Sequence, residues 1–382
     1  MNKVTKFLAI FIFSVMFLAS CSKTEKDAVS SEHFKSEITL DSTTVEGKHY
    51  IAIAAPLTGP YQALGKTIVE GAQLALEEFN DLAKDQSEKV GFVILDDGGI
   101  VIEALERAKI AIAQNVLGVI GHLNSQVSIE ASKKYFSAKI PQISPASTHP
   151  KFTERPDYRG YVYRTIGTDR QLGEAAANMV LNNSNYKRVA VLYNDKPYGV
   201  SVSSEFVRRL APDKSREVVF YEAIQLRTED HSFTARKVAK AQPDLIFFVG
   251  EYNDAGYLLK DLREQLDNGF QFLAAEGVHN QSFIEIAGNA AEGSLILGAP
   301  LPSQEIILNY QKRFKKDLAG YASTSYKATK IMLQAMKAAK FENGEMVAKQ
   351  LLQEKVFDLN GDLVDPSFTL YKVSGKTFIS VN

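Results

Sequence analysis

Short apolar runs alternate with longer amphipathic stretches along the chain from residue 49 onward. The runs have strand length and are apolar on both faces, whereas the stretches between them repeat apolar residues at helical spacing. The first series predicts strands at 50–57, 90–95, 116–122 and 140–144, and helices at 68–80, 102–115 and 129–136. Such strands, alternating with amphipathic helices, predict a parallel sheet covered on both sides.

The alternation starts afresh at residue 188. Strands are predicted at 188–193, 217–221, 245–249, 270–274 and 294–297, and helices at 201–210, 233–241, 255–266 and 282–287. Helices at 306–318 and 324–340 and strands at 367–373 and 376–381 follow. Two such series predict an α/β protein with two doubly wound parallel-sheet lobes joined by hinge crossovers. We expect lobe 1 to comprise 49–168 with about 300–365, and lobe 2 to comprise 169–299 with about 366–382.

Residues 1–20 have the pattern of a secretory signal peptide, because lysines precede a short apolar core and small residues follow it. The tetrad Leu18-Ala19-Ser20-Cys21 resembles the lipobox of bacterial lipoproteins, which implies acylation of Cys21. The alternative is a chance cysteine after an ordinary signal. Residues 21–48 are polar and lack a sustained period, so they are predicted to form a flexible tether. We therefore expect an exported protein, anchored to a membrane by a lipid at Cys21, in the periplasm or at the cell surface.

Composition excludes some classes of function. The chain has 382 residues, 45% hydrophobic content and a formal net charge of −1, which is typical of a globular protein with about two domains. The balanced charge argues against a nucleic-acid partner, since no basic surplus is present to neutralise phosphates. Cys21 is the only cysteine, so the exported domain cannot rely on disulfides for its stability.

The sequence lacks the motifs that would indicate catalysis or a cofactor. It contains no G-x-S-x-G, Walker, H-E-x-x-H or C-x-x-C motif, and its six histidines include no close pair. The spacing of Ser125 from His122 and His149 gives no specific support for a nucleophile and its base. Asp97 ends a predicted strand and is predicted to cap the next helix rather than to bind a metal. We therefore expect no enzyme, no cofactor and no metal site.

Unusual polar stretches follow several predicted strands. The stretch QISPASTHP at 142–150 is one, and others lie at 122–125, 194–199, 250–252 and 276–277. Each by itself is compatible with a solvent-exposed turn. Ligands of open α/β sheets, however, bind beyond the carboxyl ends of the strands, and two facing lobes would bring these stretches to one cleft. Their convergence favours a bound ligand.

The residue types in these stretches suit a small zwitterion. Ser125 lies where a helix is predicted to begin, so its hydroxyl and the first-turn amides can bind an anion, although a plain N-cap is the alternative. Thr148 offers a hydroxyl and an amide, and Ala146 offers bare backbone. Glu276 can accept a charge-assisted hydrogen bond from an ammonium group, or it can be a solvated loop acid.

Several stretches that are ordered along the mature chain carry a family resemblance. They are IAIAAPLTGPYQALG, VIGHLNS, ISPASTHP, YRTIGTD, VAVLYNDKPYG, QFLAAEGV with the following IAGNAAEG, and GDL near the end. From about residue 49 to the C-terminus, the chain resembles the type I periplasmic binding proteins. It is most similar to the Leu/Ile/Val-binding branch that supplies amino-acid ABC importers. The resemblance implies two lobes that close on a ligand.

The resemblance also implies roles for individual residues. Ser125, Ala146 and Thr148 would bind the ligand α-carboxylate, and Glu276, with the same turn, would meet the α-ammonium. The remaining implied residues line the closing walls or flank the serine, and they are Tyr198, Tyr321 and Leu123.

Three positions depart from the pattern of the branched-chain binders. Glu251 stands where they have a tyrosine, Asn124 replaces a small apolar or sulfur residue, and Leu64 stands where an aromatic is usual. An unpaired buried carboxylate facing an aliphatic side chain costs several kcal/mol. Either Glu251 turns away or the ligand carries a donor, so we hypothesise a ligand with a polar or cationic side chain.

The sequence thus predicts a lipid-anchored extracytoplasmic substrate-binding protein of an ABC importer. It would bind an amino acid, branched-chain-type or more polar, and present it to a permease in the membrane. The alternative is a ligand sensor, or a regulatory lipoprotein without a transport role, on the same fold.

Overall fold

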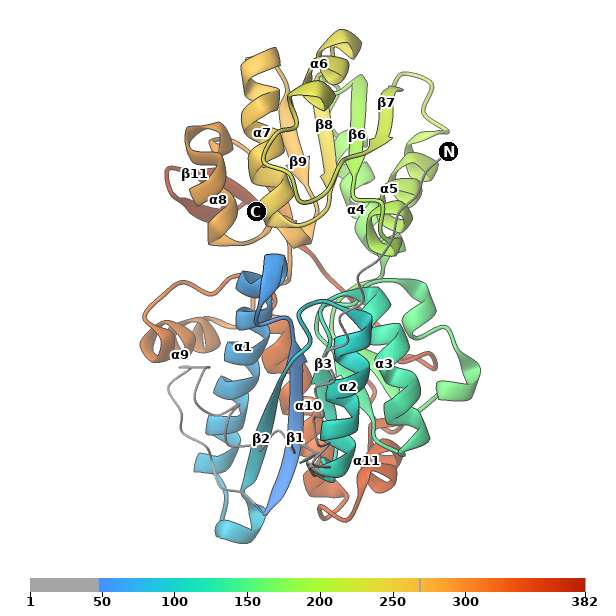
Figure 1. The fold of residues 1–382 in the computed structure, drawn as a ribbon, viewed down its shortest axis with the longest axis vertical. Helices are drawn as coiled ribbons and strands as arrows, with labels where there is room; N and C mark the ends of the chain where they lie inside the picture. The colour runs from blue at the N-terminus through green and yellow to red at the C-terminus, as the bar shows by residue number, and fades with distance from the viewer. Residues whose placement is uncertain (1–47, 268, 382) are drawn as a thin grey trace, which may run out of the picture. The chain divides into compact units, whose positions relative to one another are not determined.

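The computed structural model describes residues 48–267 and 269–381 of the chain (Figure 1). The predicted signal peptide, the predicted acylation site Cys21 and nearly all of the predicted tether lie outside the described residues. Within them the strands form two sheets. No helix in this part of the chain combines the length and apolar character that crossing a bilayer requires.

The first sheet is entirely parallel and has the strand order β2-β1-β3-β4-β5. Its strands are β1 (His49–Ala55), β2 (Val90–Asp96), β3 (Val119–Gly121), β4 (Gln142–Ser144) and β5 (Val162–Arg164). Its helices are α1 (Gln62–Asp81), α2 (Val101–Ala113), α3 (Ser125–Ser137), α9 (Gln304–Phe314), α10 (Ala322–Ala338) and α11 (Gly344–Leu351).

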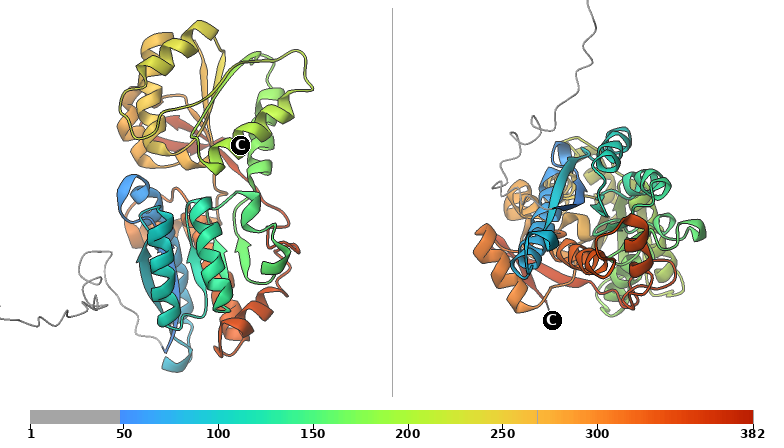
Figure 2. Two further views of the ribbon diagram at one scale, coloured as in Figure 1. Left: turned by 45° about the vertical axis from the view of Figure 1, so that its right-hand side comes forward. Right: turned by 90° about the horizontal axis from the view of Figure 1, so that it is seen from below.

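The side-chain alternation of β1 shows why helices cover both faces of this sheet. Ile51 packs into a core with α1, α10 and α11, whereas the next residue, Ala52, packs into a separate core with α2 and α3. Successive strand residues point to opposite faces, so an apolar run must be buried on both. Figure 2 shows α2 and α3 side by side on one face.

The second sheet has the order β12-β11-β10-β9-β8-β6-β7. Its parallel strands are β6 (Arg188–Tyr193), β7 (Glu217–Ala223), β8 (Leu245–Val249), β9 (Gln271–Ala274) and β10 (Leu295–Gly298). The strands β11 (Thr369–Ser374) and β12 (Thr377–Ser380) extend it in antiparallel pairing. Its helices are α4 (Asp169–Leu181), α5 (Pro197–Leu210), α6 (Ser232–Ala241), α7 (Tyr252–Leu266) and α8 (Gln281–Ala287).

This sheet is also buried on both faces. On one face Phe247 of β8 meets Phe206 of α5, with 4.3 Å between ring centroids. On the other face the next residue, Phe248, lies 6.2 Å from Phe272, which in turn stacks on Phe283 of α8. The α/β fold with two doubly wound sheets is therefore confirmed.

Within the described residues, the chain passes three times between the two sheets: from β5 to α4, from β10 to α9, and from α11 to β11. The bounds of the two lobes remain our proposal. Most predicted elements are present, and β6 and β8 have the predicted bounds. The periodicity did not predict β5, α4 or α11, and the predicted start of α3 lies four residues too late.

Candidate functional site

A cavity of about 240 Å³ lies at the carboxyl ends of strands from both sheets. Its walls come from the segments that follow β1, β2, β3 and β4 on one side, and β6, β8 and β9 on the other. Nine of the ten residues predicted to bind a ligand line it. Six of these residues lie on helices and loops that pack with the first sheet, and they are Leu64, Leu123, Asn124, Ser125, Ala146 and Tyr321. Those of the second sheet are Tyr198, Glu251 and Glu276.

Ser125 is the first residue of α3, and Asn124 is the N-cap. The interpretation of Ser125 as a plain N-cap is therefore wrong. Its hydroxyl oxygen accepts a long hydrogen bond of 3.4 Å from the backbone N–H of His149, which connects α3 to the turn after β4. Because the N-terminal amides of a helix favour negative charge, this wall of the cavity is suited to a carboxylate.

Thr148 is the one predicted residue that does not line the cavity. It lies two residues beyond the lining residue Ala146 and is fully buried. Its backbone carbonyl accepts a hydrogen bond of 2.9 Å from the N–H of Asp169, at the start of α4. The Thr148 hydroxyl oxygen is buried and makes no hydrogen bond of good geometry within the described part of the chain, but it lies near enough to the Asp169 carboxylate to favour its charged form.

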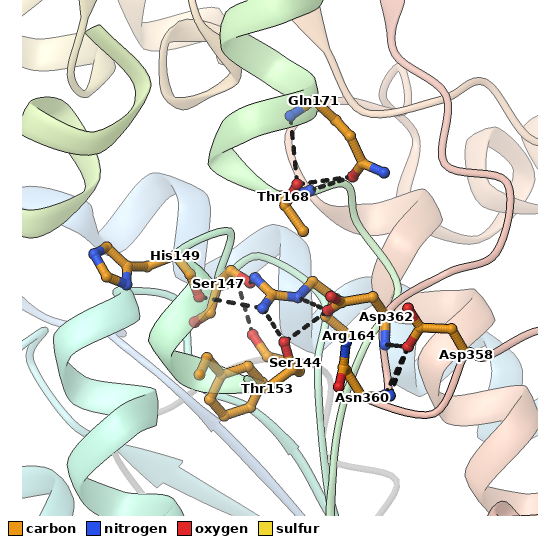
Figure 3. Close-up of polar contacts among 12 residues, drawn as sticks. Ser144, Ser147, His149, Thr153, Arg164, Thr168, Gln171, Asp358, Asn360 and Asp362 are labelled. Carbon is orange, nitrogen blue, oxygen red and sulfur yellow. Dashed lines mark hydrogen bonds and ion pairs between the residues drawn. The ribbon is translucent and has the colours of Figure 1, made fainter. Parts of the chain in front are cut away.

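A buried arginine holds the turn that contains these residues (Figure 3). The guanidinium of Arg164 donates to the carbonyl oxygens of Ser147 at 2.8 Å and His149 at 3.1 Å. It also pairs with Asp362, with 2.5 Å between Nε and Oδ1, and contacts Thr153. Arg164 is fully buried, so its charge is compensated by this network rather than by water. Sequence reasoning missed the network, although it noted the Y-R-T and G-D-L stretches that supply it.

Glu276 follows β9 and is 2% exposed, so it is not a solvated loop acid. The Tyr198 hydroxyl donates to its Oε2 at 2.9 Å, whereas its buried Oε1 has no partner among residues 48–267 and 269–381. Burial raises the pKa of Glu276 to about 8, and the carboxylates of Asp169 and Glu251 add to the shift. Gly277 allows this placement, because a Cβ there would lie 2.5 Å from the carbonyl oxygen of Gly250.

Asp169 lies close enough to Glu276 for its charge to raise the pKa of that residue. Asp169 is itself fully buried, and burial raises its own pKa to about 6. The hydroxyls of Thr148 and Ser201 oppose the shift. The inner part of the site is therefore rich in carboxyl groups, a setting that favours a positively charged ligand group.

Glu251 is the N-cap residue of α7 and is 6% exposed. It does not turn away, since it lines the cavity. The side-chain amide of Asn194 donates to its Oε2 at 2.8 Å. Burial raises the pKa of Glu251, and the nearby charge of Lys196 opposes the shift.

Asp97 does not cap α2, whose N-cap is Ile100. Its Oδ1 accepts from the N–H of Gly99 at 2.8 Å, and its Oδ2 lies 2.5 Å from Nδ1 of His122. Both residues of this pair are fully buried. No group of potential metal ligands occurs among the described residues.

Some lining residues were missed by the sequence analysis. Lys196 and Pro197 were noted only as part of a strand-end stretch, and Gly99 only as part of a turn. Arg227 lies in a loop without periodicity, so no sequence signal indicated that it reaches the cavity.

Two doubly wound sheets with one cavity at the carboxyl ends of both define the class of two-lobe ligand-binding proteins. Comparison with known proteins identifies the family. Residues 48–368 match the family model described as periplasmic binding protein. The chain belongs to this family, and specifically to the type I proteins of the branch that contains the Leu/Ile/Val-binding proteins.

Two curated relatives and one solved structure illustrate the match. A Leu/Ile/Val-binding protein homolog 1 from Brucella suis is 30% identical over 338 residues, which cover 84% of this chain and 89% of the relative. A leucine-, isoleucine-, valine-, threonine- and alanine-binding protein from Pseudomonas aeruginosa is 28% identical, with coverage of 84% and 89%. The crystal structure of a leucine-binding protein from Thermotoga maritima aligns with a TM-score of 0.79 at 25% identity and covers 87% of this chain and 98% of that one. These relatives are binding proteins, which confirms that the chain is not an enzyme.

Proposed function

We propose that the protein is the substrate-binding component of an ABC importer and binds an amino acid in the cavity between its two lobes. The cavity wall carries donors suited to a carboxylate and an acceptor suited to an ammonium group. The N-terminus of α3, with Ser125, offers donors for a carboxylate, and the unpartnered Oε1 of Glu276 offers an acceptor for an ammonium. Names of relatives agree, since the Brucella suis and Pseudomonas aeruginosa proteins are named for amino acids.

The head group would be held from both lobes. Ser125 and Ala146 would bind the α-carboxylate, and Glu276, oriented by Tyr198, would bind the α-ammonium. Leu123 and Tyr321 would form apolar walls around the ligand. A ligand held from both sides favours the closed arrangement of the lobes, which a permease can recognise.

We further propose that the chain is exported and anchored to the membrane by a lipid on Cys21, with residues up to 48 as a tether. This part rests on the sequence pattern of the leader. A sensor on the same fold would bind the same head group, so the role in transport is tested by uptake of labelled amino acid in cells that lack the protein.

Glu276→Gln tests the head-group assignment. The variant keeps the shape of the side chain and its contact with Tyr198, but it removes the negative charge that faces the ammonium. We expect affinity for the amino acid to fall by about 2–5 kcal/mol, because a buried charge loses its partner. Isothermal titration calorimetry measures the loss.

The control for this variant is Glu285→Gln, which makes the same chemical change at an exposed position of α8. It should bind like the wild-type protein. Wild-type affinity in Glu276→Gln would contradict the assignment of the ammonium site.

A further inference from the structure

We propose that the ligand is an amino acid with a neutral side chain that donates hydrogen bonds, a hydroxyl or a carboxamide, and that Glu251 and Asn124 select it. This inference deepens the proposed function and rests on it, since the head group must be held by Ser125 and Glu276 for the side chain to reach these two residues. Relatives named for leucine, isoleucine and valine do not require such a donor.

The first acceptor is the carboxylate of Glu251. It lies in the cavity wall, and its Oε2 is engaged by Asn194. Its second oxygen has no hydrogen bond to another residue, and the carboxylate forms no ion pair within 4 Å, among the residues that the structure describes. The backbone N–H of Glu251 itself also favours the ionised carboxylate, and a ligand in the cavity can add a further donor.

The second acceptor is the side chain of Asn124. Its Oδ1 is buried and has no partner in the described part of the chain, and the residue lines the same cavity. Gly99 makes room for it, since a Cβ at that position would lie 2.9 Å from Oδ1. Two polar acceptors from opposite lobes therefore line one cavity: the Glu251 carboxylate, which Asn194 contacts at one oxygen, and the unpartnered Oδ1 of Asn124.

The cations around Glu251 argue for a neutral donor rather than a charged one. Lys196 lines the cavity, and its charge acts on the Glu251 carboxylate. Its ammonium also lies 4.4 Å from the centroid of the Tyr61 ring. Arg227 adds a second positive charge at an exposed part of the wall. Lys196 thus already supplies a counter-charge to the Glu251 carboxylate, so a neutral hydrogen-bond donor, rather than a further positive charge, completes its environment.

An aliphatic side chain would supply no donor to either Glu251 or Asn124. Sites built to hydrogen-bond a polar substrate group reject the analogue that lacks it, by up to about 10⁴-fold, because the polar groups of the site are then unpaired. The ratio of affinities for two ligands of similar shape, one with a hydrogen-bond donor and one without, therefore measures the contribution of the donor.

The test is calorimetric titration of the full-length protein in detergent, refolded to remove carried ligand. Two pairs of similar shape are compared, threonine with valine and asparagine with leucine, and lysine is added as the charged probe. We expect threonine and asparagine to bind at least about tenfold tighter than their partners, and lysine to bind more weakly than asparagine.

Glu251→Leu should reduce the preference for threonine over valine, and that for asparagine over leucine, to less than about threefold, since it removes the charged acceptor. The matched control Glu264→Leu, at an exposed position on the same helix α7, should leave them unchanged. Asn124→Ala provides a second variant if Glu251→Leu does not fold, and it should also narrow both preferences.

Three outcomes would overturn the inference: tighter binding of valine or leucine than of their partners, tightest binding of lysine, or unchanged preferences in both variants. If leucine wins and Glu276→Gln abolishes its binding, the proposed function stands and only this inference falls. If none of the amino acids binds, both fall.

Discussion

At Glu276, burial and hydrogen bonding act in opposite directions on one carboxyl group. Burial disfavours the charged form, and the hydroxyl of Tyr198 favours it. Burial prevails and raises the pKa to about 8, so the protonated form of Glu276 gains weight near neutral pH in the ligand-free protein. An amino-acid ammonium would reverse this balance by pairing with the carboxylate.

Ligand binding should therefore release a proton. The ammonium lowers the pKa of Glu276 below its value of about 8 in the empty site, so the bound state carries fewer protons below that pH. We expect affinity to rise with pH up to about 8, by at most about tenfold per pH unit, and then to level off. Calorimetry between pH 5.5 and pH 8, in buffers of different ionisation enthalpy, measures both the slope and the proton count. Affinity that stays constant across this range, without proton release, would contradict the assignment.

The sequence predicted residues that line the cavity better than it predicted their surroundings. Strand-end position identified Ser125, Ala146 and Glu276, because the carboxyl ends of parallel strands meet at one place. It could not identify Arg227, which lies in a loop, or the burial of Asp169, which depends on contacts with distant segments. It was wrong about Asp97, whose side chain binds Gly99 and His122 instead of capping α2.

At the scale of elements, the turn after β4 is positioned by segments far away in the chain. Arg164 on β5 holds the carbonyls of Ser147 and His149, and Asp362 precedes the return to the second sheet. Gly361 permits this approach, since its φ is +95° and a Cβ there would lie 2.2 Å from the carbonyl oxygen of Val162. The binding turn and a crossover between the sheets thus share one buried charge network.

Arg164→Met should destabilise the protein by about 3–5 kcal/mol, because it leaves Asp362 without its buried partner and the turn carbonyls without donors. Urea unfolding followed by circular dichroism measures the change. Arg170→Met is the matched control, because Arg170 lies on the surface of α4 and its pair with Glu174 is solvent-exposed. Equal stability of the two variants would show that the network does not hold the turn.

Periodicity predicted the elements with strong apolar patterns and missed those whose burial arises from tertiary packing. The strand β5 has three residues, too few to show a period. The helix α4 packs against α5 through alanine and glycine as well as larger residues, so its apolar face is weakly marked in the sequence. Its capping box, Thr168 with Gln171, was the available signal.

In the described chain as a whole, two contacts connect the segments on either side of the cavity. Neither contact belongs to the proposed head-group site. The Tyr252 hydroxyl on α7 donates to the carbonyl oxygen of Pro60 at 2.9 Å. Lys196 meets Tyr61, the residue before α1. These contacts form between the lobes and so stabilise the closed arrangement for any ligand.

Tyr252→Phe should weaken the binding of all ligands by the same factor, because it removes one inter-lobe hydrogen bond and no ligand contact. A loss of about 0.5–1.5 kcal/mol corresponds to roughly twofold to tenfold in affinity. Calorimetry with two different amino acids measures it. The control is Tyr257→Phe, on the same helix, because the Tyr257 hydroxyl bonds to the exposed Glu229. A change in the ratio between ligands would instead place Tyr252 at the ligand.

Anchoring is also a property of the whole chain. Cys21→Ala removes the proposed acylation site, so we expect the protein to move from the membrane fraction to the soluble extracytoplasmic fraction. Ser22→Ala, beside it, should leave the protein in the membrane fraction. Cell fractionation with immunoblotting distinguishes the two, and a membrane-bound Cys21→Ala protein would contradict the lipid anchor.

A thermal-shift screen tests whether the cavity binds an amino acid by its head group. Full-length protein, refolded to remove carried ligand, would be screened against the common amino acids, their decarboxylated amines and their deaminated acids. Stabilisation grows with ligand concentration relative to Kd, so tight binders stand out. We expect amino acids of one side-chain class to raise the unfolding temperature. The matching amines and acids should not raise it, because the site needs both the ammonium and the carboxylate of the head group. An equal shift from a compound that lacks either group, or no shift from any amino acid, would contradict it.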